Sequence, residues 1–142
     1  MNSAPFPELF QEATSGVVPY ELLSRISEET STPAPEIVDA LSIYVARAYA
    51  DGKLSFEEGD RVMNAIFSAS VSEKFWADYD RTVPPTMLAV YQAFDAGEYF
   101  HEGDDMCTHP EVKYTRPLIE KLLAERSRDA QPIAAADGYA GR

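Results

Sequence analysis

The chain has 142 residues, of which 45% are hydrophobic and 25% are charged, a length and composition typical of one soluble domain with a buried core. Acidic residues outnumber basic residues by 24 to 12, so the formal net charge at pH 7 is −12. This charge argues against binding to nucleic acid or to an anionic membrane surface, because either would repel the protein, and it is compatible with a basic protein partner.

The sequence also bears on the cellular compartment. Cys107 is the only cysteine, so no disulfide can form within the chain and a reducing compartment is expected. The first residues, MNSAPFPELF, lack the basic flank and the apolar stretch of a secretory signal. No apolar run approaches the length that crosses a bilayer. We therefore expect a cytoplasmic protein that does not bind membranes.

Helical periodicity dominates the chain, and alternation of the kind that strands show is absent. The predicted helices span residues 7–13, 18–29, 32–52, 55–70, 73–80, 84–97 and 116–128. The sequence thus predicts an all-α fold, a compact bundle of about six to seven short helices. We expect a single helical domain over residues 1–128 and a mobile C-terminal tail over residues 129–142, which has little apolar surface to bury.

Three of these helices are preceded by a residue that commonly caps a helix. Ser55 and Glu58 have the Ser-x-x-Glu spacing of a capping box, in which each side chain bonds a backbone N–H of the other residue. Ser72 precedes the fifth helix and Thr115 precedes the last one. The sequence therefore predicts side-chain caps at all three positions.

The stretch YADGKLSFEE, residues 49–58, resembles the second half of an EF-hand calcium-binding loop. On this alignment Asp51 and Gly52 take the fifth and sixth loop positions, and Ser55 and Glu58 take the ninth and twelfth. The resemblance implies a turn at the glycine and a helix that starts at the serine. It implies calcium ligands only if the first half of the loop supplies oxygen atoms as well.

The first half of that loop departs from the EF-hand pattern. Arg47 falls at the first ligand position and Tyr49 at the third, so a cation and a phenol stand where calcium needs carboxylates. We therefore expect residues 36–70 to form an EF-hand-like helix-turn-helix corner without bound calcium. A degenerate EF-hand module that has lost the ion is one of the functional alternatives.

A loop rich in possible metal ligands, FHEGDDMCTHPE, spans residues 100–111. His101, Cys107 and His109 could supply three ligands, and a fourth could come from Glu102, Asp104 or Asp105, of which we select Asp104. This mixture of nitrogen, sulfur and oxygen suits zinc. The spacing matches no strong zinc motif, and a solvated acidic loop between two helices explains the same residues. A metal-binding protein or metal-dependent enzyme that uses residues 101–109 is therefore an alternative.

Acidic residues gather in the region that contains this loop, together with several aromatic residues. They are Asp78, Asp80, Asp95, Glu98, Glu102, Asp104 and Asp105, and the aromatic residues among them are Tyr79, Tyr99 and Phe100. An acidic rim with aromatic anchors is typical of a protein-binding site. The predicted partner-binding residues are Asp95, Glu98, Tyr99, Phe100, Glu102, Asp104 and Asp105.

No phosphate-binding glycine loop, HExxH, GxSxG or CxxC motif is present in the sequence. The chemistry and the charge together favour a small acidic protein-interaction domain without catalytic activity or cofactor. Its partner would be a basic protein, which it could neutralise as bacterial immunity proteins and antitoxins do; the analogy is one of physical type. The sequence leaves the partner and the oligomeric state open.

Overall fold

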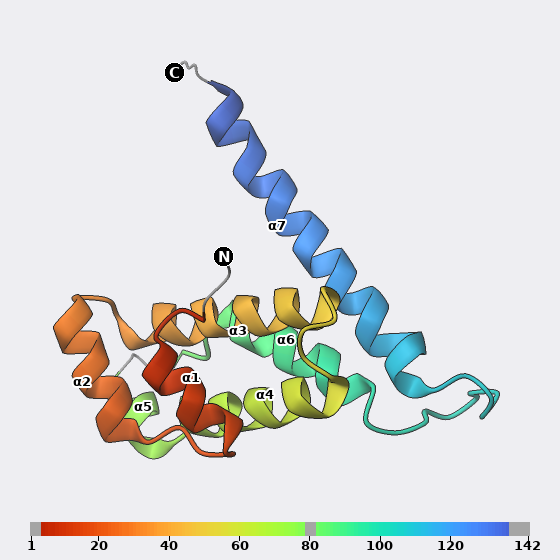
Figure 1. Cartoon of the computed structure of the whole chain (residues 1–142), viewed down its shortest axis with the longest axis horizontal. Helices are drawn as coiled ribbons and strands as arrows, with labels where there is room; N and C mark the ends of the chain where they lie inside the picture. The colour runs from red at the N-terminus through yellow and green to blue at the C-terminus, as the bar shows by residue number, and fades with distance from the viewer. Residues whose placement is uncertain (1–3, 79–81, 137–142) are drawn as a thin grey trace.

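The computed structural model describes residues 4–78 and 82–136 (Figure 1). In chain order its helices are α1 (Pro7–Thr14), α2 (Tyr20–Thr30), α3 (Ala34–Ala50), α4 (Phe56–Ser70), α5 (Glu73–Asp78), α6 (Pro85–Ala96), a π-helical turn (Glu111–Thr115) and α7 (Arg116–Ala136). The described ranges contain no strand, so the prediction of an all-α bundle is confirmed.

Two sequence predictions concern ends of the described ranges. The fifth helix was expected to reach residue 80, but Tyr79 and Asp80 lie outside the described residues. The last helix was expected to end at residue 128, and it continues to Ala136, so helix covers the first part of the expected tail. The mobility of that tail stays a prediction.

Helices α3, α4 and α6 form the centre of the bundle, and α1 and α2 lie at one side of them (Figure 1). The first turns of α7 pack against this centre through Ile119, which is fully buried, and the rest of α7 projects away from the bundle. The largest fully buried side chains of the three central helices are Ile37, Val38, Leu41, Val45, Met63, Ile66, Met87 and Phe94. Their burial supplies the main driving force for folding.

A close approach of α4 to α6 occurs at Gly59. A Cβ atom at this position would lie only 2.6 Å from Cζ of Phe94, so a larger residue would have to displace the buried Phe94 ring. The Phe94 ring also packs on Tyr49, with ring centroids 5.2 Å apart. Gly59 therefore brings its neighbour Asp60 close to the C-terminal end of α6.

The corner between α3 and α4 has the local chemistry that the sequence predicts. Gly52 has a φ of 78°, and the amide of Glu58 donates to Ser55 Oγ at 3.1 Å while the amide of Ser55 donates to Glu58 Oε1 at 2.8 Å. The capping box is thus confirmed. Helix α3 continues through Ala50, so the resemblance of this corner to an EF-hand stays a prediction.

The predicted cap at Ser72 is present, since the amide of Phe75 donates to its Oγ at 3.3 Å. The predicted cap at Thr115 is wrong. Thr115 lies inside continuous helical backbone, is fully buried, and donates its hydroxyl to the carbonyl oxygen of Ala93 at 2.7 Å. The reason is tertiary: a Cβ at Gly97 would overlap this hydroxyl, so α6 and the π-helical turn touch here.

Candidate functional site

The loop of residues 97–110 lies at one end of the bundle, between α6 and the π-helical turn (Figure 1). Asp104 holds it in place. Its Oδ2 accepts the amide of His101 at 2.7 Å, and its Oδ1 accepts Lys113 Nζ and the Tyr114 hydroxyl, both at 2.6 Å. The side chain is only 3% exposed, so Asp104 supports the loop and offers little surface to a partner.

These bonds also set the ionisation of Asp104. The hydrogen bond from Lys113, followed by those from Tyr114 and the His101 amide, holds the pKa of the Asp104 carboxyl well below its usual range. All three donors favour the charged form of the acid. The carboxylate is therefore ionised at neutral pH, and the cation of Lys113 compensates its charge.

Asp105 organises the next turn of the same loop. Its Oδ1 accepts the amides of Cys107 at 2.9 Å and Thr108 at 3.0 Å, and these backbone bonds, that of Thr108 first, lower the pKa of its carboxyl. Met106, which lies between Asp105 and Cys107, has a φ of 63°, in the left-handed region that a bulky residue rarely adopts. The side-chain bonds of Asp105 thus enclose a strained, exposed methionine.

The predicted zinc ligands occupy this loop in separate settings. The carbonyl of Ala96 lies 2.8 Å from His101 Nε2 and can only accept, so this nitrogen carries the proton. His109 Nδ1 accepts the amide of Glu111 at 3.1 Å, and Cys107 is exposed. Within residues 4–78 and 82–136 no three His, Cys, Asp or Glu side chains are grouped so that they could hold a metal ion.

The predicted partner-binding residues divide into two groups. Asp104 and Asp105 use their carboxylates within the loop, as described above, and Asp95 is half-buried. Five of the predicted residues are exposed: Glu98, Tyr99, Phe100, Glu102 and Asp105. The acids that precede them in sequence do not all join them. Asp78, on α5, accepts the hydroxyl of Tyr20 on α2, and α5 lies away from the loop (Figure 1).

A cluster of three carboxyl groups, which sequence reasoning missed, lies where α4 meets the end of α6. Asp60 on α4 faces Asp95 and Glu98, and its carboxyl shares a hydrogen bond with that of Glu98. Burial, then this hydrogen bond, then repulsion from Glu98 and Asp95 raise the pKa of Asp60 to about 7. We refer to these three residues as the carboxyl cluster.

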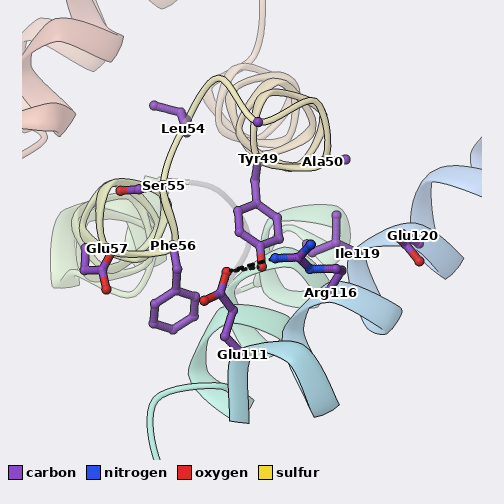
Figure 2. A pocket seen from close by; sticks show the side chains of 11 residues that line it. Tyr49, Ala50, Leu54, Ser55, Phe56, Glu57, Glu111, Arg116, Ile119 and Glu120 are labelled. Carbon is purple, nitrogen blue, oxygen red and sulfur yellow. Dashed lines mark hydrogen bonds and ion pairs between the residues drawn. The ribbon is translucent and has the colours of Figure 1, made fainter. Parts of the chain in front are cut away.

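A pocket of about 400 Å³ lies between the α3–α4 corner, the π-helical turn and the start of α7 (Figure 2). The Tyr49 hydroxyl donates to Glu111 Oε2 at 2.6 Å, and Arg116 Nη2 lies 3.6 Å from the same oxygen. Figure 2 shows these three side chains converging from α3, the π-helical turn and α7. The further lining residues are Ala50, Gly52, Leu54, Ser55, Phe56, Glu57, Ile119 and Glu120.

The pocket has polar groups of both signs. Burial, followed by the hydrogen bond to Glu111, raises the pKa of Tyr49 far above its usual range, so this phenol stays protonated and cannot act as a base near neutral pH. Arg116 pairs with Glu111 and remains more than half exposed. The contacts among Tyr49, Glu111 and Arg116 hold the start of α7 against the α3–α4 corner. The residues that line the pocket include no paired nucleophile and base.

No protein-family model matches the chain, and neither the curated proteins nor the solved structures contain a match. In the described part of the chain, none of the helices combines the length and the apolar character needed to cross a membrane.

Proposed function

We propose that this protein is a non-catalytic interaction domain that binds a basic protein partner at the end of the bundle formed by the 97–110 loop. The binding residues are the exposed side chains of Glu98, Tyr99, Phe100, Glu102 and Met106, which we call the loop surface. By covering a basic surface of its partner, such a domain would neutralise it, as immunity proteins and antitoxins do.

The observation that carries this proposal is the pair of exposed acids beside exposed aromatic side chains. Neither Glu98 nor Glu102 forms an ion pair with a cationic side chain in the part of the chain that the structure describes. No cation of the described residues therefore neutralises either charge, although Glu98 also shares a hydrogen bond with Asp60. With a net charge of −12, the protein would attract a basic partner over a Debye length of about 8 Å at physiological salt.

The hydrogen bonds of Asp104 add a second argument, because they fix the loop before any partner arrives. A surface that is ordered in advance loses less conformational entropy on binding, which favours affinity. The role of Asp104 is then to position the loop surface, and the contacts with the partner fall to its exposed neighbours.

Comparative capture from an extract of the source cells at low salt tests this function. The Glu98→Gln/Glu102→Gln variant removes two charges from the loop surface. The Glu12→Gln/Glu28→Gln variant removes two charges from exposed positions on α1 and α2 and serves as the matched control. We expect the natural protein and the control to retain the same basic protein, and the loop variant to lose it.

Raising the salt concentration in the wash should release the captured basic partner, because salt screens the charges that hold it. Retention of identical proteins by all three forms would contradict the proposed function. So would retention of acidic proteins only.

A further inference from the structure

The loop end of the bundle concentrates exposed apolar side chains. Seven large hydrophobic side chains are exposed among the described residues, and four of them lie in residues 99–112: Tyr99 (56%), Phe100 (39%), Met106 (64%) and Val112 (51%). Single exposed apolar residues are common on soluble proteins, whereas a group of them rimmed by polar residues marks an interaction site.

The four side chains belong to one ordered segment. Asp104 ties His101 to Lys113 and Tyr114 through hydrogen bonds of 2.6 to 2.7 Å. The ring of His101 also packs between Tyr99 and Tyr114, with centroid distances of 5.7 and 4.2 Å. These contacts hold the two ends of the segment together, so its apolar side chains are presented by a fixed backbone.

The backbone conformation and the exposure of Met106 are the most specific evidence for a binding surface. The left-handed conformation costs a residue with a side chain about 1–2 kcal/mol. Three glycines adopt positive φ among the described residues, and so do Phe6, Ser31 and Met106. Phe6 and Ser31 cap the ends of α1 and α2, whereas Met106 lies in a loop and caps no helix. A methionine that keeps this strained conformation while 64% exposed gains nothing from the core of its own domain. Strain of this kind is concentrated at functional sites, and the flexible, polarisable methionine side chain suits a binding surface.

The charges around these residues restrict what can cover them. Glu98 and Glu102 are exposed beside the apolar side chains, and the chain as a whole carries a charge of −12. A second copy of the chain would bring the same charge and be repelled. A partner segment that is both basic and apolar on one face would satisfy the acids and cover the apolar side chains together.

We propose that the loop surface, extended by Val112, is a docking site for a basic amphipathic segment of a partner protein, with Met106 as its apolar anchor. This inference rests on the proposed function, and it adds the chemistry of the segment that the partner presents. Lysine or arginine side chains of that segment meet Glu98 and Glu102. An apolar side chain between them packs on Met106 and Phe100.

Three synthetic peptides of equal length test this inference through their affinity for the purified full-length protein. The first places leucine at positions i, i+3, i+4 and i+7 and lysine at the others, so that a helix of it is amphipathic; the second has serine in place of leucine, and the third has glutamate in place of lysine. We expect only the lysine–leucine peptide to bind well, as measured by fluorescence anisotropy at low and physiological salt.

Substitution of Met106 separates binding from folding. Met106→Gly removes the anchor and relieves the left-handed strain, so we expect the affinity for the lysine–leucine peptide to fall about tenfold or more. The melting temperature should stay the same or rise slightly. Val71→Ala shortens another exposed apolar side chain, after the C-terminal end of α4 and thus at the other end of that helix from Asp60, and should leave the affinity unchanged.

Several results would overturn the inference. Equal binding of the lysine–serine peptide would show that charge alone acts, which removes the apolar anchor but leaves the proposed function in place. Equal or stronger binding of the glutamate–leucine peptide would exclude a basic segment. An unchanged affinity in Met106→Gly, or no binding of any peptide, would overturn the docking site; the capture experiment above then judges the proposed function separately.

Discussion

Asp60 and Asp104 lie near the same end of the molecule and have opposite electrostatic properties. Asp104 is almost completely covered and yet has a pKa well below its usual range, because Lys113, Tyr114 and the amide of His101 all donate to it. Asp60 is only half-buried and has a pKa of about 7. Burial and the neighbouring acids Glu98 and Asp95 raise this pKa, and only the hydrogen bond from Asn64 lowers it.

The comparison teaches that burial by itself does not decide how a carboxyl group ionises. What decides it is whether the surrounding groups donate hydrogen bonds and positive charge or supply further negative charge. At this end of the bundle the loop supplies donors to Asp104, while the end of α6 supplies carboxyl groups to Asp60. One aspartate therefore fastens the loop, and the other leaves the junction of α4 and α6 dependent on pH.

The largest expected effect is that of Asp104→Asn, which removes the carboxylate that accepts bonds from Lys113, Tyr114 and the His101 amide. The amide cannot hold Lys113 by charge, and one of its two acceptor positions becomes a donor, so the loop loses bonds that close it. We expect faster hydrogen exchange at the amide of His101 and a melting temperature lower by several degrees.

Glu102→Gln is the matched control for Asp104→Asn, because it removes one charge from an exposed position of the same loop. It should change neither the exchange rates nor the melting temperature appreciably. Unchanged exchange in Asp104→Asn would mean that the loop is held by other contacts.

A smaller effect, with a defined pH dependence, is expected from Asp60→Asn. The folded-state pKa of about 7 exceeds the unfolded value of about 3.9, so the folded protein binds more protons between these values. Stability due to Asp60 is therefore fully present below about pH 4 and is lost as the pH rises through 7. After allowance for its half-exposed position, we expect a loss of about 1 kcal/mol.

Urea unfolding at a series of pH values measures this loss. In Asp60→Asn an uncharged amide replaces the titrating group, so the free energy of unfolding should fall less between pH 4 and pH 8. Asp51→Asn removes one charge from the exposed corner of α3 and α4 and should keep the pH dependence of the natural protein. Identical pH profiles for all three proteins would refute the role of the carboxyl cluster.

The smallest effect on stability is expected from added metal ions, and it tests whether Asp104 is free to bind one. Both oxygens of this predicted zinc ligand already accept hydrogen bonds, which an ion would have to displace. Millimolar calcium or stoichiometric zinc should therefore shift the melting temperature by less than about 1 °C. A zinc-dependent rise that Cys107→Ser abolishes, or a calcium-dependent rise that Glu58→Gln abolishes, would favour the metal-binding alternatives.

Much of the fold could be predicted because its signals are local. The Ser55–Glu58 capping box involves side chains and amides three residues apart, and Gly52 ends a helix by its own conformational freedom. Asp39 shows the limit of such reasoning. Its Oδ1 accepts the amide of Met87 at 2.8 Å and so caps α6 from α3, while the residue before that helix, Pro84, has no side-chain cap.

The candidate site likewise has features that the sequence could predict and features that it could not. The sequence by itself placed acids and aromatic residues in one loop, and their exposure at Glu98, Tyr99, Phe100 and Glu102 follows from a polar, glycine-containing segment between helices. It could not distinguish the buried Asp104 from its exposed neighbours, since the donors that cover it come from the following π-helical turn.

Only the tertiary structure decided which distant residues meet. Asp60 reaches Glu98 because Gly59 lets α4 approach the Phe94 ring. Tyr49 reaches Glu111 because α6 and α7, which flank and contact the π-helical turn, both pack against α3. The sequence by itself determined the helices, the net negative charge and the residues of the loop, because these depend on neighbours along the chain. The pairing of side chains across helices depends on how the apolar faces pack, and that is settled only when the whole bundle forms.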